Sequence, residues 1–231
     1  MAKAVEIPVY LFTGFLEGGK TRFIRETLED KKFNAGEHTL LVLCEEGEEE
    51  YDLSHPLMKN VHILPIESEE ELTTEKLGEW QKIHRVDRVV IEYNGMWLLQ
   101  RLYEQMPQGW MIYQEVMLAD YNTFLSYNTN MRSLMVDKLT SCEMVLLNRA
   151  PVGADKMEIH KVIRGVSRRT DIGYDYVDGS FDYDEIEDPL PFDINAPVIE
   201  IGDNDFAVWY RDLTEEMEKY QGKTVRFKGR V

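Results

Sequence analysis

The segment from Gly14 to Thr21, GFLEGGKT, constrains the fold more than any other part of the sequence. It matches every fixed position of the phosphate-binding loop pattern G-x-x-x-x-G-K-[ST]. The apolar run from Val5 to Phe12 precedes it and predicts a buried strand, and the residues from Thr21 to Asp30 follow with the spacing of an amphipathic helix. Strand, loop and helix in this order are the context in which the motif binds phosphate.

The residues inside the loop have the chemistry of a phosphate site. Glycines allow the backbone to curl so that successive N–H groups point at an anion, and the helix start adds unpaired N–H groups. The ammonium group of Lys20 can reach the terminal phosphates, and the hydroxyl of Thr21 can bind Mg²⁺. Arg22 either contacts a phosphate or faces solvent. The residues expected to contact a nucleotide here are Gly14, Glu17, Gly18, Gly19, Lys20, Thr21 and Arg22.

Apolar and amphipathic segments alternate along most of the chain. Several apolar runs are continuous, which is typical of strands buried on both faces of a parallel sheet. With the phosphate loop after the first strand, this order predicts a doubly wound α/β domain with a mostly parallel sheet. Further strands are expected at Thr39–Cys44, Val61–Ile66, Arg88–Glu92, Glu115–Ala119 and Glu143–Asn148, and further helices at Glu69–His84, Met96–Gln105, Asn122–Thr140 and Ala154–Val166.

The composition changes near Asp171, where acids, prolines and glycines become frequent. We therefore predict a P-loop nucleotide-binding domain over residues 1–170 and an acidic linker over residues 171–192. Residues 193–231 are expected to open a second α+β module, with a strand at Pro197–Ile201, a helix at Phe206–Tyr220 and a strand at Thr224–Val231. Because the sequence ends within that last expected strand, the module could be truncated.

Charge and composition exclude several classes of function. A formal net charge of −17 makes the chain a poor binder of nucleic acid and of anionic membranes. No apolar run approaches the ~20 residues that span a bilayer, so direct membrane insertion is not expected. The N-terminal apolar run leads into the phosphate loop instead of a cleavage site, and two cysteines cannot form a disulfide framework. We expect a reduced, cytoplasmic protein.

Three short segments accompany the phosphate loop. Cys44–Asp52 reads CEEGEEEYD after the second strand, Ile91–Gly95 reads IEYNG, and Leu118–Asp120 reads LAD. Together with TGFLEGGKTR at Thr13–Arg22, they resemble the CobW-type family of P-loop GTPases, over about residues 5–165. That family is associated with delivery of metal cofactors and is related to the nickel-insertion GTPases of urease and hydrogenase.

The resemblance implies a Mg²⁺-dependent GTPase that acts as a switch in metal or cofactor homeostasis, with a protein partner or a homodimer. Thr21, Glu92 and Glu45 would hold Mg²⁺, directly or through water. Lys20 would stabilise the phosphates, and Glu48 or Glu45 would orient the attacking water. For the acids from Glu48 to Glu50, a solvated acidic loop is an equal alternative.

Two departures from the family pattern affect what can be carried over. The family's Cys-x-Cys-Cys motif is absent, so the sequence supports no zinc site. The guanine-reading motif Asn-Lys-x-Asp becomes Asn148-Arg149-Ala150-Pro151, which keeps Asn148 and Arg149 as expected nucleotide contacts but lacks the carboxylate. Asp155 could substitute for it, and the choice between GTP and ATP stays open.

Two other functions compete with the GTPase. The departures also fit a non-hydrolysing, nucleotide-responsive adaptor for a membrane or metal-handling partner. A small-molecule kinase is a third alternative, with Arg164, Arg168 and Arg169 as lid candidates. The C-terminal segments Phe206–Asp212 and Tyr220–Gly229 resemble the start of a β-rich domain linked to putative permeases, and a simple capping element is an equal alternative.

Overall fold

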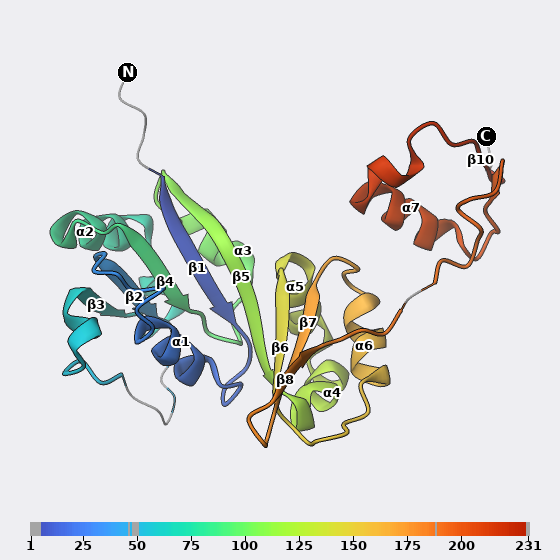
Figure 1. The fold of residues 1–231 in the computed structure, drawn as a ribbon. Coiled ribbons are helices and arrows are strands. Elements are labelled where there is room, and N and C mark those ends of the chain that lie inside the picture. The colour runs from blue at the N-terminus through green and yellow to red at the C-terminus, as the bar shows by residue number, and fades with distance from the viewer. Residues whose placement is uncertain (1–5, 46, 48–50, 188, 230–231) are drawn as a thin grey trace. The chain divides into compact units, whose positions relative to one another are not determined.

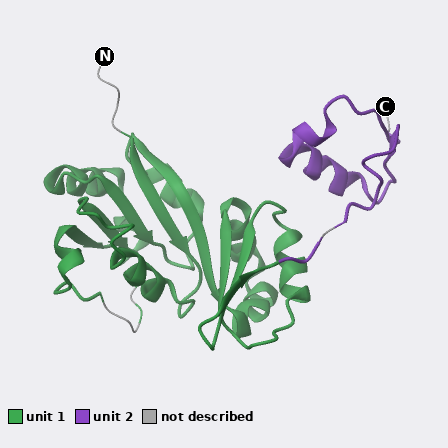
Figure 2. Ribbon diagram, viewed as in Figure 1, with its two compact units in different colours: residues 1–184 green, residues 185–231 purple. Residues whose placement is uncertain are grey.

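The computed structural model describes residues 6–45, 47, 51–187 and 189–229. The chain forms two compact units, residues 1–184 and residues 185–231 (Figure 2). Each unit has its own hydrophobic core. The phosphate loop and the short motif segments at Cys44–Asp52, Ile91–Gly95 and Leu118–Asp120 all belong to the first unit.

An eight-stranded sheet forms the centre of the first unit (Figure 1). Its strand order is β3-β2-β4-β1-β5-β6-β7-β8, with parallel neighbours from β3 to β7 and an antiparallel β8 at the edge. The strands are β1 (Ile7–Thr13), β2 (Thr39–Leu43), β3 (Val61–Pro65), β4 (Arg88–Glu92), β5 (Trp110–Asp120), β6 (Met144–Ala150), β7 (Asp171–Tyr176) and β8 (Phe181–Tyr183). The predicted doubly wound α/β fold with a mostly parallel sheet is confirmed.

Helices cover both faces of this sheet because alternate residues of each central strand point to opposite cores. Val9 and Leu11 of β1 share a core with α2 and α3, whereas Phe12 packs with Ile24 and Leu28 of α1. The helices are α1 (Lys20–Leu28), α2 (Thr74–His84), α3 (Leu99–Gln105), α4 (Tyr121–Asn130), α5 (Arg132–Ser141) and α6 (Met157–Arg164), with 3-10 turns η1 (Pro56–Asn60) and η2 (Glu69–Glu71). Helices α4 to α6 pack on the face that also carries α2 and α3.

The structure differs from the expected elements in several places: β5 begins at Trp110 instead of Glu115, and the helix expected over Glu69–His84 is divided into η2 and α2. The helix predicted over Asn122–Thr140 is broken at Met131, whose φ of −130° ends α4 before α5 begins. The acidic linker predicted from residue 171 is wrong over β7 and β8, because Ile172, Gly173 and Tyr174 are buried against β6 in spite of the acids around them. The wider division into a nucleotide-binding domain and a second module stays a prediction.

The second unit combines a short helix with a two-stranded parallel sheet. It contains β9 (Ile199–Glu200), α7 (Phe206–Glu215), the 3-10 turn η3 (Met217–Tyr220) and β10 (Val225–Arg226). Ile199, Trp209 and Tyr220 are among the residues that form its core. The strand expected over Thr224–Val231 is shorter than predicted, and its last two residues lie outside the described part of the chain.

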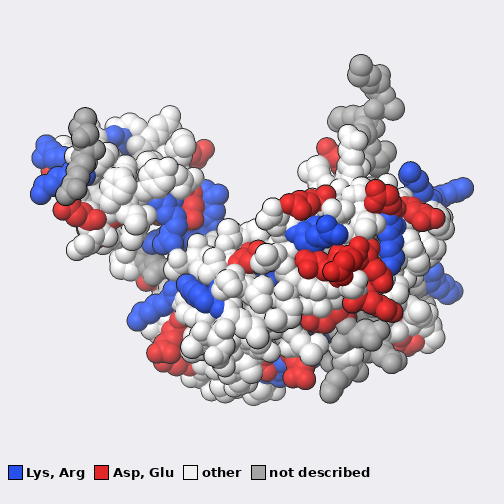
Figure 3. Space-filling model, turned by 180° about the vertical axis from the view of Figure 1, so that it is seen from behind, with Lys and Arg blue, Asp and Glu red and all other residues white. Residues whose placement is uncertain are grey.

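Acidic side chains gather into a band over part of the first unit, on the face that Figure 3 shows. Such a surface repels polyanions. Within the described residues, no helix has both the length and the apolar character needed to cross a bilayer.

Candidate functional site

The loop between β1 and α1 can only take its path with glycine at key positions. Gly14 has φ +127°, and a Cβ placed there would lie 2.0 Å from the carbonyl oxygen of Leu118 in β5. A Cβ at Gly18 would lie 2.8 Å from the same oxygen. Gly19, with φ +87°, precedes α1 and offers no side chain to cap it. The loop therefore lies directly on the end of β5, and the first N–H groups of α1 stay available for an anion.

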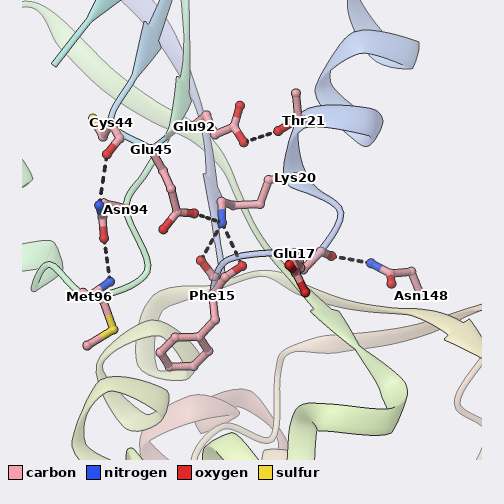
Figure 4. Close-up of polar contacts among 12 residues, drawn as sticks. Phe15, Glu17, Lys20, Thr21, Cys44, Glu45, Glu92, Asn94, Met96 and Asn148 are labelled. Atoms are coloured by element: carbon pink, nitrogen blue, oxygen red, sulfur yellow. Dashed lines mark hydrogen bonds and ion pairs between the residues drawn. The ribbon is translucent and has the colours of Figure 1, made fainter. Parts of the chain in front are cut away.

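Lys20 is the centre of the polar contacts in this loop (Figure 4). Its ammonium group donates to the carbonyl oxygens of Gly14 at 2.8 Å and Phe15 at 2.9 Å. A third bond, 2.5 Å long, joins it to Oε2 of Glu45, which follows β2. The side chain of Lys20 is 3% exposed and that of Glu45 is 11% exposed, so the ion pair is largely shielded from water.

Thr21 and Glu92 lie next to each other beside Lys20. The Thr21 hydroxyl donates to Oε1 of Glu92, the last residue of β4, at 2.6 Å. Tyr51 donates its hydroxyl to Oε2 of the same carboxylate, also at 2.6 Å. Burial raises the pKa of Glu92 above its usual range, while these two hydrogen bonds and the charge of Lys20 partly oppose that shift. Tyr51 was missed by the sequence analysis, because a tyrosine after an acidic run has no distinctive spacing.

A cavity of about 400 Å³ opens over these groups. Most of the predicted nucleotide and magnesium residues line it, and the structure thus brings together segments that are far apart in sequence: Glu17, Gly18, Gly19, Lys20, Thr21, Arg22, Glu45, Glu92 and Arg149. Gly14 does not line this cavity, but its carbonyl oxygen accepts a hydrogen bond from the Lys20 ammonium group. Glu48, the other predicted water-orienting residue, lies outside the described residues.

Asn148 and Arg149 brace the phosphate loop from the end of β6. The Asn148 amide nitrogen donates to the carbonyl oxygen of Gly18. Arg149 adopts φ +55° and donates to Oδ2 of Asp120 at 2.7 Å and to the carbonyl oxygen of Glu17 at 2.5 Å. Both predicted nucleotide contacts therefore have partners within the chain. A left-handed backbone at Arg149 is costly for a residue other than glycine, and such strain concentrates at functional sites.

Asn94 connects two loops at the site and was also missed by the sequence analysis (Figure 4). Its amide nitrogen donates to the carbonyl oxygen of Cys44 at 3.1 Å, and its amide oxygen accepts from the N–H of Met96 at 2.8 Å. The neighbouring Gly95 packs on the phosphate loop, since a Cβ there would lie 2.6 Å from the Gly14 oxygen. The motif IEYNG marks this loop, but it does not reveal the bond to Cys44.

The surroundings of Cys44 and of the nearby histidines are typical of residues that pack in the protein interior and not of metal ligands. The thiol of Cys44 is buried, and this burial raises its pKa, which disfavours the thiolate that metals prefer. His62 stacks on His84, with 4.0 Å between ring centroids. In the described ranges, no three side chains of the types His, Cys, Asp and Glu gather so that they could hold a metal ion. Mg²⁺ at Thr21 and Glu92 would need phosphate and water oxygens as its other ligands.

Comparisons with known proteins support the fold. No model of a protein family matches the sequence. The pre-mRNA-splicing factor SYF1 of Debaryomyces hansenii is 30% identical over 95 residues, which cover 38% of this chain and 11% of that protein. The chain thus spans about a tenth of that relative's length, and the match carries no statement about the whole chain.

A solved structure covers much more of the chain. The hydrogenase maturation factor HypB from Archaeoglobus fulgidus superposes with a TM-score of 0.50 at 13% sequence identity, over 75% of this chain and 82% of that one. At this identity the similarity establishes the fold alone, and the resemblance to CobW-type GTPases stays a prediction. With its parallel sheet and phosphate loop, the chain has the α/β P-loop NTPase fold that HypB also has.

Proposed function

We propose that this protein binds a nucleoside triphosphate together with Mg²⁺ at the phosphate loop. The arrangement of Lys20 beside the Thr21–Glu92 pair carries the proposal, because it places a cation for phosphate and two oxygen ligands for Mg²⁺ at one helix start. The ligand would be GTP or ATP, and the HypB-like fold supports a GTPase-type function.

The contacts of Lys20 indicate how the phosphates would enter. An ammonium group has three N–H donors, and all three are engaged, by Gly14, Phe15 and Glu45. The two carbonyl contacts hold the amine in place, whereas Glu45 is a negatively charged group in the position that a phosphate oxygen would take. Nucleotide binding would therefore exchange the Glu45 carboxylate for a phosphate.

The pair formed by Thr21 and Glu92 would supply the magnesium site. Mg²⁺ commonly binds one or two protein oxygens and completes its octahedron with phosphate and water. A buried carboxylate is costly to keep charged, so a nearby divalent cation would stabilise the ionised form of Glu92. After its exchange with phosphate, Glu45 could add a water-mediated contact to the ion.

Hydrolysis of the β,γ-phosphoanhydride is the natural reaction at such a site. Lys20 and Mg²⁺ would neutralise the charge that develops on the phosphates, and Glu45 or Glu48 would orient the attacking water. A CobW-like switch in the cytoplasm, working with a protein partner or as a homodimer in metal or cofactor homeostasis, is consistent with the sequence motifs. HypB is a hydrogenase maturation factor, which adds support for a role in the maturation of a partner.

A non-hydrolysing adaptor is the second candidate, and the Lys20–Glu45 ion pair favours it. The pair gives Lys20 a counterion within the chain, so that nucleotide binding alone, without hydrolysis, would displace the Glu45 side chain. Measured turnover of GTP and ATP separates the two functions, since tight binding with negligible turnover identifies the adaptor. A kinase would instead transfer phosphate to an added small-molecule acceptor.

Calorimetric titration of the whole chain with GTP and with ATP, each with Mg²⁺, tests the proposal. We expect Lys20→Ala to weaken nucleotide binding by at least about tenfold, because charge-assisted hydrogen bonds to phosphate contribute about 1.5–3 kcal/mol. Lys82→Ala, which removes an exposed lysine from α2, is the matched control and should bind as the unmodified protein does. Equal binding by the Lys20 variant, or no binding by the unmodified protein, would refute the proposal.

A further inference from the structure

At the end of β6, the described residues offer no obvious group that could recognise the base of a bound nucleotide. Pro151 stands where a base-reading carboxylate is expected, and proline has no such group. Asp155, the substitute considered from sequence, uses its carboxylate to accept the N–H of Met157 at 3.0 Å, at the start of α6. It lines neither the cavity over Lys20 nor the second cavity beside it. Asp155 is therefore not placed to contact a bound nucleotide.

The second cavity, about 90 Å³, adjoins the first and shares Gly19, Arg22 and Arg149 with it. A nucleotide with its phosphates at Lys20 would extend its nucleoside along these shared residues. Phe23 of α1 and Leu146 of β6 line the second cavity and offer apolar surface to the faces of a planar base. The cavity therefore has the position and the lining of a base site.

Two carboxylates line this second cavity, and they differ in their partners. Glu26 accepts from Arg22 at 2.9 Å, an ion pair within α1. Asp175 lies near the end of β7, where the pairing of β6 and β7 is irregular between Leu147 and Ala150. Among the contacts of the described residues, the Asp175 carboxylate has no hydrogen-bond or ion-pair partner, although it faces a cavity that it shares with Asn148 and Arg149.

We propose that Asp175 reads the base and selects guanine, in place of the carboxylate that the segment after Asn148 lacks. A carboxylate only accepts hydrogen bonds, and the Watson–Crick edge of guanine presents two adjacent donors, N1–H and the N2 amino group. Adenine presents the acceptor N1 beside its amino group, and xanthine presents a carbonyl at position 2, so a carboxylate pairs with each of them less well. The inference rests on the proposed nucleotide site and adds its base preference.

Competition against a fluorescent GTP analogue, with Mg²⁺ present, tests this assignment on the whole chain. The competitors are GTP, ATP and xanthosine triphosphate, for the unmodified protein and for Asp175→Asn and Asp155→Asn. For the unmodified protein we expect GTP to bind at least about tenfold more tightly than the other two, as for a bidentate contact to a base edge. Asp175→Asn should weaken GTP by a similar factor and strengthen xanthosine triphosphate, because the amide can donate to the carbonyl at position 2. Asp155→Asn should leave the ranking unchanged.

The results distinguish this inference from the proposed function. Binding of all three nucleotides without a preference for GTP overturns the role of Asp175 and leaves the phosphate site intact. An unchanged ranking in Asp175→Asn, or a changed ranking in Asp155→Asn, overturns it as well. If no nucleotide binds or displaces the analogue, the proposed function itself fails, and the base assignment with it.

Discussion

Replacement of Glu45 by glutamine gives the sharpest test of the competition between Glu45 and a phosphate for Lys20. Glu45→Gln keeps the size of the side chain and removes its charge. The ion pair with Lys20 is short and largely shielded from water; glutamine keeps a hydrogen bond from the ammonium group but loses the attraction between two opposite charges, which we take as about 1 kcal/mol. A phosphate that displaces the glutamine therefore has to replace an interaction with Lys20 that is about 1 kcal/mol weaker. This difference predicts nucleotide binding about five- to tenfold tighter.

The assay is a titration of GTP and ATP in the absence and presence of Mg²⁺. Without Mg²⁺ the gain in affinity isolates the competition at Lys20, whereas with Mg²⁺ any contact of Glu45 to the ion reduces the gain. Turnover measured in parallel should fall if Glu45 also orients the attacking water. Glu79→Gln, which removes one exposed carboxylate from α2, controls for net charge. Unchanged or weaker binding of the Glu45 variant without Mg²⁺ would refute the competition between Glu45 and phosphate.

The remaining predictions concern the loop and the magnesium pair. Gly14→Ala should lower the free energy of unfolding by roughly 2–4 kcal/mol in chemical denaturation, because its Cβ would lie 2.0 Å from the Leu118 oxygen and φ is +127°. Gly36 also has a positive φ but lies in open space, so the difference between Gly14→Ala and Gly36→Ala measures the cost of the close contact. Glu92→Gln should raise the Mg²⁺ concentration needed for tight nucleotide binding by about tenfold, and an unchanged Mg²⁺ requirement would contradict its assignment. Since burial raises the pKa of Glu92, the folded state without ligand binds this proton more tightly than the unfolded state does. Relative to Glu92→Gln, the stability of the unmodified protein should therefore fall as pH rises from the usual pKa of glutamate through the raised one. Its Mg²⁺ affinity should rise over the same pH range. Unfolding measured for both proteins across this range tests the direction of the stability change.

The sequence predicted those parts of the fold that depend on local pattern. Continuous apolar runs identified the central parallel strands, because a strand covered on both faces needs no polar alternation. Lys20, Thr21 and Glu92 could be singled out from sequence because a fixed motif and an acid at the end of a buried strand both have local signatures; the structure brings them to one cavity, and their roles stay predictions. The break at Met131 had no such signature, because no proline or glycine occurs there.

The missed features depend on contacts between distant segments. Asp171 to Tyr183 looked like a linker because its acids alternate with the buried residues Ile172 and Tyr174, and only pairing with β6 identifies the strand. Tyr51 and Asn94 form their site contacts over 41 and 50 residues of sequence. Asp175, whose carboxylate has no polar partner among the described residues, lines the second cavity because β7 pairs with β6, a contact that no local pattern in the sequence indicates.

The two hydrogen bonds of Asn94 have a mechanical consequence. One side-chain amide ties the carbonyl of Cys44, directly before Glu45, to the backbone of Met96. Further along, the fully buried Lys138 of α5 donates to the carbonyl oxygen of Trp97 at 3.0 Å. A displacement of Glu45 that also shifts the backbone at Cys44 would either break the Asn94 bond, at about 1 kcal/mol, or move the 94–97 loop with it. Such a backbone shift would reach α5, on the sheet face opposite α1, through Asn94, Met96 and the Trp97–Lys138 contact.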